Sequence, residues 1–326
     1  MNLLETCMER CKKNPKRIVF ADANDVRVMQ AARYLVDEKI AEPILIGGPM
    51  NLRDEADRYK VSTRGFLIMQ PSQGKDLQKY AGLLYDERKH KGLSIKDAEQ
   101  LIQDNLYYGA MLVRNNAADI CIAGNLSLTA DVLRSAIKVI GLPQRIKTVS
   151  SFFIMISPDV KNVYAFADGG VIPEPSSEQL SDIAITTEQN YKNITGNEPK
   201  AVMLSFSTKG SADHPSIKRI QEATAICQSK DPDLIVDGEM QFDAAIDPKV
   251  GRRKAAGSPV QGEANVFIFP SLEAGNIGYK IAERLGGYSA LGPFIQGLKN
   301  PMHDLSRGCS TEDIINSVIL SSCMVN

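Results

Sequence analysis

Arg17-Ile-Val-Phe-Ala21 is a short apolar run that predicts a buried strand, and a helical stretch from Val26 to Lys39 follows it. The next strand, Pro43-Ile-Leu-Ile-Gly47, precedes another helical stretch near residues 51–59. Strands that alternate with helices in this way are typical of a parallel sheet with helices on both faces. Ligands of such sheets bind where the strands end and the helices begin.

The alternation continues to the end of the chain. It predicts three more strand–helix pairs: 118–124 before 128–140, 200–205 before 217–228, and 264–269 before 274–285. Near Gly141-Leu142-Pro143 one helix ends and an apolar strand, Thr148–Ile156, begins, which indicates a domain boundary. We therefore expect two α/β domains, residues 1–145 plus 300–326 and residues 146–299, with the active site in the cleft between them.

Length and composition restrict the class of protein. The chain has 326 residues, 43% of them hydrophobic and 24% charged, which is typical of a soluble globular protein of two domains. The formal net charge of −1 argues against a nucleic-acid or membrane partner held by bulk electrostatics. Residues 1–16 are charged and amphipathic and lack the apolar centre of a signal peptide, so we expect a cytoplasmic protein.

The cysteines give no metal-binding pattern. Among the six, only Cys7 and Cys11 are close in sequence, four residues apart on an expected helix. The chain has only three histidines, and no zinc-type spacing occurs. We expect no metal site, and we expect reduced cysteines that are mostly small core residues.

The segment Asp304-Leu-Ser-Arg-Gly-Cys-Ser-Thr-Glu-Asp313, which leads into the apolar run 314–324, carries the most concentrated chemistry. Ser310 has the pattern of a helix N-cap, and Asp313 can reach back to the cap amide. A helix N-terminus attracts anions, and Arg307 adds a rigid cationic fork suited to phosphate or carboxylate. The segment therefore predicts an anion site beside a carboxylate; the simpler alternative is a capping box with a surface arginine.

Three more polar segments follow strands. Ser205–Ser211 carries four hydroxyls, a lysine and a glycine, although it lacks the glycine spacing of a P-loop. Phe269–Lys280 offers glycines for close backbone approach with polar groups around them, and Gly124–Thr129 precedes Arg134. Taken singly, these segments are equally well explained as ordinary polar loops and helix packing.

Together the segments resemble the phosphate acetyltransferase (phosphotransacetylase) family over nearly the whole chain. The matching blocks are Leu204–Ser211, Asp237–Ala245, Ala264–Pro270, Glu273–Lys280 and Asp304–Ser310. Ser-Phe-Ser-Thr-Lys-Gly-Ser and Asp-Leu-Ser-Arg-Gly-Cys-Ser are specific signatures, and the chain contains both in the right order.

The resemblance implies reversible acetyl transfer, acetyl-CoA + phosphate ⇌ CoA + acetyl phosphate, in acetate metabolism. It implies two three-layer α/β domains with mainly parallel sheets, of the type shared with isocitrate and isopropylmalate dehydrogenases, and a homodimer. Coenzyme A is then a substrate, and no cofactor or metal is required.

The resemblance also assigns roles to residues. Asp313 matches the general base, Arg307 the phosphate-binding arginine, and Ser306 its hydrogen-bonding neighbour. The substrate-binding prediction comprises Arg88, Arg134, Ser207, Thr208, Lys209, Gly210, Ser211, Asn276, Gly278, Tyr279, Lys280 and Cys309.

The expected mechanism is direct attack by the CoA thiol on the acetyl carbonyl in a ternary complex. A CoA thiol resembles cysteine, with a pKa of about 8.5, so a positioned carboxylate can take its proton. Cys309 as a covalent nucleophile is the alternative, since thiols near helix N-termini and arginines are activated. No nearby histidine supports it.

Departures from the family pattern leave other functions open. The first strand ends in Ala21-Asp22-Ala23 where the family has Pro-Glu-Gly, a family histidine position is Ser127, and Asp168-Gly-Gly-Val171 replaces Asp-Cys-Ala-Val. The alternatives are a phosphate butyryl- or propionyltransferase and a non-catalytic CoA-binding paralogue. A dehydrogenase of the same fold would need an aspartate metal set and a nucleotide loop, neither of which can be assembled here.

Overall fold

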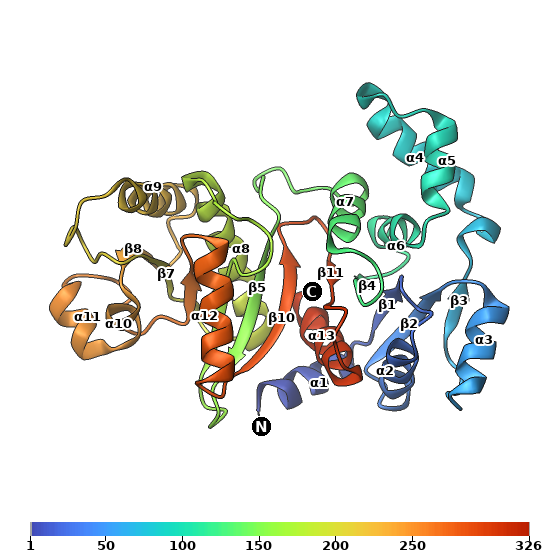
Figure 1. The fold of residues 1–326 in the computed structure, drawn as a ribbon, viewed down its shortest axis with the longest axis horizontal. Helices are drawn as coiled ribbons and strands as arrows, with labels where there is room; N and C mark the ends of the chain where they lie inside the picture. Colours follow the sequence, from blue (N-terminus) through green and yellow to red (C-terminus); the bar gives the residue numbers. More distant parts are fainter. Residues whose placement is uncertain (1, 326) are drawn as a thin grey trace. The chain divides into compact units, whose positions relative to one another are not determined.

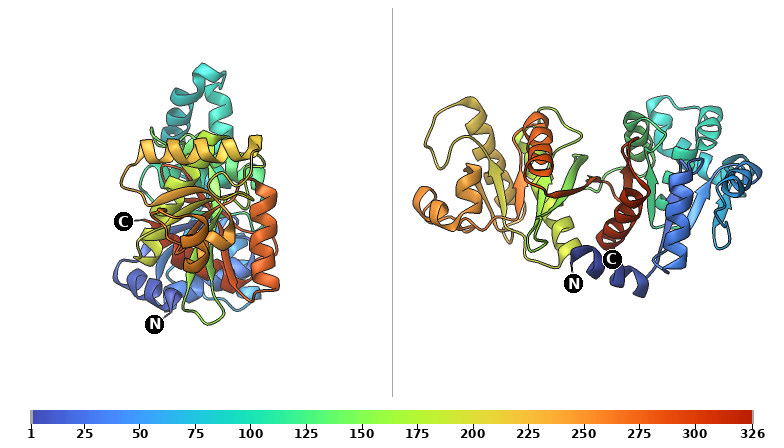
Figure 2. Two further views of the ribbon diagram at one scale, coloured as in Figure 1. Left: turned by 90° about the vertical axis from the view of Figure 1, so that its left-hand side faces the viewer. Right: turned by 60° about the horizontal axis from the view of Figure 1, so that its bottom comes forward.

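The computed structural model describes residues 2–325 of the chain. Contacts divide it into two compact units, shown as ribbons in Figures 1 and 2. Unit 1 contains residues 3–141 and 298–325, and unit 2 contains residues 142–297. The C-terminal segment therefore belongs to the same unit as the N-terminal part of the chain.

Unit 1 is built on a five-stranded sheet in the order β11-β4-β1-β2-β3, with every neighbouring pair parallel. Val19 and Ala21 belong to the core cluster formed with the helices of residues 77–139, so the alternation along β1 directs Ile18 and Phe20 to the opposite face. Strands covered on both faces are continuous apolar runs, which explains why the sequence predicted the first, second and fourth strands. The two three-residue strands, Leu67–Met69 and Met302–Asp304, are too short to give such a run and were not predicted. The strands are β1 (Lys16–Phe20), β2 (Ala41–Ile46), β3 (Leu67–Met69), β4 (Ile120–Ala123) and β11 (Met302–Asp304).

Helices cover both faces of this sheet. In α6, all residues from Leu106 to Val113 are buried, and Gly109 allows a close approach, because a Cβ there would lie 3.0 Å from the Cys121 sulfur. The helices are α1 (Leu3–Lys13), α2 (Val26–Asp37), α3 (Pro49–Arg58), η1 (Pro71–Gln73), α4 (Leu77–Arg88), η2 (Lys89–Lys91), α5 (Ile95–Ile102), α6 (Asn105–Arg114), α7 (Thr129–Val139) and α13 (Thr311–Met324).

Unit 2 has a six-stranded mixed sheet in the order β10-β5-β6-β9-β7-β8. The pairs from β6 to β8 are parallel, whereas β5 is antiparallel to both β6 and β10. A short connection joins β5 to β6, and strands joined so closely must run antiparallel. The strands are β5 (Ser150–Ile156), β6 (Val163–Ala167), β7 (Ala201–Leu204), β8 (Val236–Met240), β9 (Val266–Ile268) and β10 (Ser289–Gln296).

The helices of unit 2 begin at well-defined caps. Ser176 and Gln179 form a reciprocal capping box at the start of α8, and Ser271 caps α12. Gly275 in α12 is required by packing, since a Cβ there would lie 2.1 Å from the carbonyl oxygen of Asp168. The helices are α8 (Ser177–Thr195), α9 (Pro215–Lys230), α10 (Phe242–Ile246), α11 (Pro248–Lys254) and α12 (Leu272–Arg284). Within residues 2–325, no helix is long and apolar enough to cross a membrane.

Candidate active site

Three loops of unit 1 meet at one edge of its sheet. Strands β11, β4 and β1 are adjacent and parallel, so the segments that follow their carboxyl ends lie side by side. These segments are residues 21–25, 124–128 and 305–310, and together we call them the three-loop cluster. This edge is where parallel α/β sheets bind their ligands.

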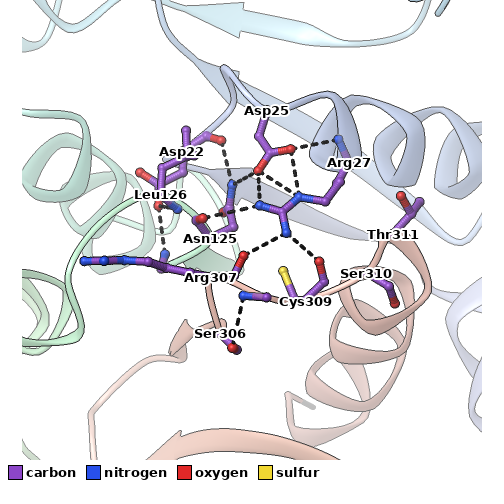
Figure 3. A network of polar contacts seen from close by, with 12 residues as sticks. Asp22, Asp25, Arg27, Asn125, Leu126, Ser306, Arg307, Cys309, Ser310 and Thr311 are labelled. Carbon is purple, nitrogen blue, oxygen red and sulfur yellow. Dashed lines mark hydrogen bonds and ion pairs between the residues drawn. The ribbon is translucent and has the colours of Figure 1, made fainter.

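A clamp formed by Asp25 and Arg27 fixes the third loop of this cluster (Figure 3). Asp25 caps α2 by accepting the Arg27 amide at 2.9 Å, and its Oδ2 accepts from Arg27 Nη2 at 2.6 Å. Arg27 Nη1 donates to the carbonyl oxygens of Arg307 and Cys309, at 2.9 and 2.6 Å. Burial pushes the pKa of Asp25 upward, but hydrogen bonds from Arg27 and Asn125 outweigh it and hold the pKa below its usual value.

Asp22 organises the second loop. Its Oδ2 accepts the amides of Gly124, Leu126 and Ser127 at 2.8, 3.2 and 3.0 Å, and its Oδ1 accepts the Ser127 hydroxyl at 2.6 Å. Asp22 and Ser127, two separate departures from the family pattern in the sequence, are therefore partners in space. The Asp22 carboxylate therefore holds the loop through three backbone amides and one hydroxyl.

Asp304 holds the end of β11 against the start of α7. Its Oδ2 accepts the Thr129 hydroxyl at 2.6 Å. Burial, assisted by the charge of Asp22, raises the pKa of Asp304. Gly124 adopts φ +95°, and a Cβ there would lie 2.1 Å from Asp304 Oδ1, so only glycine fits this position.

The loop after β11 leaves its two key polar groups exposed. The Gly308 amide donates to Ser306 Oγ at 3.2 Å and the Cys309 amide to the Ser306 carbonyl at 3.0 Å, which forms a tight turn. The Arg307 guanidinium is exposed and has no hydrogen-bond or ion-pair partner among residues 2–325. Cys309 is only 7% exposed, and burial raises the pKa of its thiol.

The predicted capping box at the start of α13 is confirmed. Ser310 Oγ accepts the Asp313 amide at 3.1 Å, while Asp313 Oδ2 accepts the Ser310 amide at 2.8 Å and its hydroxyl at 2.9 Å. The other oxygen, Oδ1, has no hydrogen bond within the described part of the chain, and the residue is exposed. One carboxylate can therefore cap the helix through one oxygen and present the other to solvent.

Arg88 is half-buried at the end of α4 and Arg134 is exposed on α7, and both guanidinium groups are paired with groups of α7. Arg88 donates to the carbonyl oxygens of Ile137 and Lys138 at 3.0 and 2.9 Å, at the carboxyl end of that helix. Arg134 forms an ion pair with Asp131 one turn away. Neither guanidinium reaches the three-loop cluster, although both remain accessible to a ligand.

In unit 2, the loop Ser207–Ser211 is organised around Glu239. This carboxylate, 1% exposed, accepts the Gly210 amide at 2.7 Å and the Ser207 hydroxyl at 3.0 Å. Burial acts to raise the pKa of Glu239, but these donors and Gln221 lower it overall. Lys209 pairs with Asp237, and the Thr208 amide donates to the Ser211 hydroxyl at 3.0 Å. Most polar groups of this loop are thus already paired within the unit.

The predicted residues of α12 also make packing contacts. Asn276 Nδ2 donates to the Gly169 carbonyl at 3.0 Å, and the Tyr279 ring stacks on Phe153 with centroids 4.0 Å apart. Lys280 Nζ lies 5.8 Å from the Tyr279 ring centroid, and a Cβ at Gly278 would lie 2.9 Å from the Phe269 ring. The glycines therefore serve close packing of α12 against its own unit.

Sequence reasoning assigned no site role to the residues that organise the loops. Asn125 and Glu239 lie within segments that the sequence singled out, Gly124–Thr129 and Asp237–Ala245, but each meets its partners only through the sheet topology. Asp25 and Arg27 did carry a signal, an N-cap aspartate followed two residues later by arginine. Among residues 2–325, no group of three or more His, Cys, Asp or Glu side chains is arranged to hold a metal ion.

The chain is similar to known proteins both in sequence and in fold. The profile of a family described as "Phosphate acetyl/butaryl transferase" matches residues 2–322. The phosphate acetyltransferase of Thermoanaerobacterium thermosaccharolyticum is 41% identical over 322 residues, 98% of each chain. The crystal structure of a phosphotransacetylase from Streptococcus pyogenes has a TM-score of 0.94 at 38% identity, over 98% of this chain and 97% of that one. A branched-chain phosphotransacylase from Enterococcus faecalis, 18% identical with a TM-score of 0.70, shares the fold.

Proposed function

The chain belongs to the phosphate acetyl/butaryl transferase family, and on that premise we propose that Ser306, Arg307 and Asp313 carry its chemistry. The protein is an acyltransferase, and its reaction is the reversible one, acetyl-CoA + phosphate ⇌ CoA + acetyl phosphate. Curated relatives at about 40% identity are phosphate acetyltransferases, which favours acetyl over butyryl or propionyl groups.

The unpaired Arg307 guanidinium is the single observation that carries the phosphate site. The neighbouring Arg27 guanidinium is already paired with Asp25 and with two backbone carbonyl oxygens. Arg307, in contrast, is exposed beside the N-terminus of α13. A guanidinium binds phosphate through two parallel charge-assisted hydrogen bonds, and the helix terminus adds partial positive charge. We assign Arg307 and the Ser306 hydroxyl to the phosphoryl group of acetyl phosphate.

Asp313 acts as the general base through Oδ1. Its Oδ2 is occupied by the capping box, so the proton from the CoA thiol goes to the other oxygen. A thiol of pKa about 8.5 needs only partial proton removal as sulfur attacks the carbonyl, so a carboxylate in the right position can serve as the base.

Charge then develops on the carbonyl oxygen and on the departing phosphate. Arg307 stabilises the phosphate oxygens, so the C–O bond breaks as the C–S bond forms. Cys309 takes no covalent part, because it is buried and its thiol pKa is raised. Direct transfer in a ternary complex is therefore the proposed route.

The remaining assignments are also proposals. Arg88 and Arg134 offer cationic contacts to the phosphates of CoA or to the acyl phosphate. In unit 2, Ser207–Ser211 and the α12 residues Asn276, Gly278, Tyr279 and Lys280 are proposed to contact substrate, with Cys309 near the site in unit 1. We further propose a cytoplasmic homodimer that acts on small molecules and on neither nucleic acid nor membranes.

The test is thioester formation by purified protein from CoA and acetyl phosphate, followed by absorbance, with butyryl phosphate in parallel. Fast turnover with acetyl phosphate and little with butyryl phosphate is expected. Faster turnover with butyryl phosphate would contradict the acetyl assignment. CoA binding by calorimetry without turnover of either would contradict the enzyme and indicate a binding paralogue.

A further inference from the structure

Unit 2 contains a cavity at the edge of its sheet opposite the Ser207–Ser211 loop. Its walls come mainly from α8 and from the two segments that lead into β7 and β8, residues 196–200 and 231–235. These segments enter the amino ends of two parallel strands, whereas Ser207–Ser211 follows the carboxyl end of β7. The cavity has a volume of about 460 Å³, within the roughly 300–1,000 Å³ of small-molecule sites. The reaction proposed above uses none of the residues that line it.

Glu188 of α8 lines this cavity without a protein partner. The residue is 0% exposed, and neither of its carboxyl oxygens has a hydrogen-bond partner among residues 2–325. Protonation does not remove the problem, because the hydroxyl of a carboxylic acid also needs an acceptor. Since buried polar groups in folded proteins are nearly always hydrogen-bonded, Glu188 indicates a donor that the chain itself does not supply.

The charge around Glu188 is negative. Asp231 and Asp233 also line the cavity, and neither forms an ion pair within the described part of the chain. Lys192, the one cation among the described lining residues, already pairs with Glu198 at 3.1 Å. A ligand therefore meets three carboxyl groups that no protein cation balances, and the cavity attracts cations.

The rest of the wall favours an organic cation over a metal ion. Ile146, Ile185 and Leu234 line the cavity and are only partly buried. Across residues 2–325, no group of three or more carboxyl, imidazole or thiol side chains is arranged to hold a metal ion. Carboxyl groups that do not converge on one point, with aliphatic side chains beside them, fit an ammonium group on an alkyl chain.

We propose that this cavity binds a small alkylammonium cation, with one or two primary ammonium groups, and that one ammonium group pairs with Glu188. An ammonium group donates up to three hydrogen bonds, which supplies what the two Glu188 oxygens lack. The inference rests on the buried, unpartnered carboxyl group and on the acidic, partly apolar cavity that it lines. It does not depend on the proposed acetyl transfer.

Binding should displace a proton from Glu188. Burial, assisted by the charges of Asp231 and Glu198, raises the pKa of Glu188 to about 8, so the group is mostly protonated at pH 7. From α9, Cys227 stays neutral at this pH because burial raises its pKa to about 12. The strands packed against α8, namely β5, β6, β7 and β9, carry no charged side chain. An ammonium group stabilises the carboxylate, so binding at pH 7 should release close to one proton.

The first experiment is calorimetry of the purified protein at pH 7 with three probes of equal chain length. The probes are 1,4-diaminobutane, 1-aminobutane and the neutral 1,4-butanediol. We expect both amines to bind at least about tenfold more tightly than the diol. Heats measured in buffers of different ionisation enthalpy should show about one proton released per bound amine. Equal affinity for amines and diol, or no binding of the amines, would overturn the proposal.

A variant of the buried carboxyl group tests its role. Glu188→Gln keeps the size of the side chain but cannot ionise, so it should weaken both amines about tenfold and abolish the proton release. Glu178→Gln is the matched control, because Glu178 is exposed on the same helix and does not line the cavity. Amine binding and proton release that persist in Glu188→Gln would overturn the assignment.

A variant at the exposed rim keeps the test valid if Glu188→Gln does not fold. Asp233→Asn should weaken 1,4-diaminobutane severalfold and leave the proton release unchanged, because Glu188 is intact. Binding that is equally strong in Asp233→Asn and in the wild type would contradict the acidic cavity. Potassium chloride provides the last comparison: stoichiometric binding of potassium with the affinity of the amines would overturn the choice of an organic cation.

Discussion

The loop after β11 in unit 1 and the loop after β7 in unit 2 look alike in sequence but differ in what their polar groups do. Both follow a parallel strand and both carry hydroxyls and a cation. In the first, Arg27 donates to the backbone carbonyl oxygens of Arg307 and Cys309, and the Arg307 guanidinium has no partner among residues 2–325. In the second, Glu239 accepts the Gly210 amide and the Ser207 hydroxyl, and Asp237 forms an ion pair with Lys209.

Two loops with similar polar residues can therefore differ in how many of their charges are left without a protein partner. Lys209 already pairs with Asp237, so an anion that binds it competes with that carboxylate. Arg307 has no such competitor, and its fork can bind a phosphate directly.

Replacing Arg307 by Ala should lower kcat/KM for acetyl phosphate by about 10²–10³-fold, because a donor aimed at developing charge is lost. The melting temperature should stay unchanged, since the guanidinium has no protein partner. Arg307→Lys should recover part of the activity by restoring the charge without the fork. Near-wild-type kinetics in the alanine variant would contradict the assignment of Arg307 to the phosphate site. They would also show that an unpaired charge does not mark the ligand site.

Replacing Asp313 by Asn should lower kcat by about 10²-fold, because the base is lost. The measurement is kcat for CoA acetylation beside the free energy of unfolding from urea titration. A loss of about 1 kcal/mol of stability with kcat retained would instead make Asp313 a cap and nothing more.

Replacing Arg27 by Leu should destabilise unit 1 by about 2 kcal/mol, because the mostly buried Asp25 carboxylate loses its charge partner. Arg58→Leu is a control in the same unit, since Arg58 is exposed and pairs with Glu55 at 3.8 Å, so the cost should stay below about 1 kcal/mol. Urea unfolding measures both. Equal costs would mean that the clamp does not fix the loop.

Replacing Glu239 by Gln should cost about 1–2 kcal/mol at neutral pH, because charge-assisted bonds to the Ser207–Ser211 loop are lost. The folded-state pKa of Glu239 is lowered, so its stabilisation is present above its unfolded pKa and disappears as pH falls through the folded value. The difference between variant and wild type should therefore shrink below about pH 4. A pH-independent difference in urea titrations would contradict the role of the charge.

Replacing Arg134 by Ala should change stability by less than about 1 kcal/mol, because its pair with Asp131 is exposed. If Arg134 contacts CoA as proposed, the KM for CoA should rise about tenfold with kcat little changed. Lys138→Ala, on the same helix, is the control for a general loss of positive charge. An unchanged KM would leave Arg134 as an ordinary surface residue.

Local sequence patterns predicted five strand–helix pairs, the mainly parallel sheets and the capping box. These depend on local properties: strands buried on both faces are continuous apolar runs, and Ser310 and Asp313 need only a three-residue spacing to satisfy each other. The sequence also identified the family, because two specific motifs occur in the expected order. Arg307 was predicted as a phosphate ligand in the same way, since its cationic fork precedes a helix start that the sequence shows.

Only the tertiary structure decided which charges remain free. Asp22 meets Ser127, and Arg27 meets the Arg307 and Cys309 carbonyls, because the sheet places β1 between β2 and β4 and adds β11 beside β4. The pairing of Lys209 with Asp237 and the hydrogen bond from the Cys323 thiol to the Cys7 carbonyl oxygen depend likewise on segments distant in sequence. Local patterns fix which groups a loop contains, whereas long-range packing fixes which of those groups already have a protein partner.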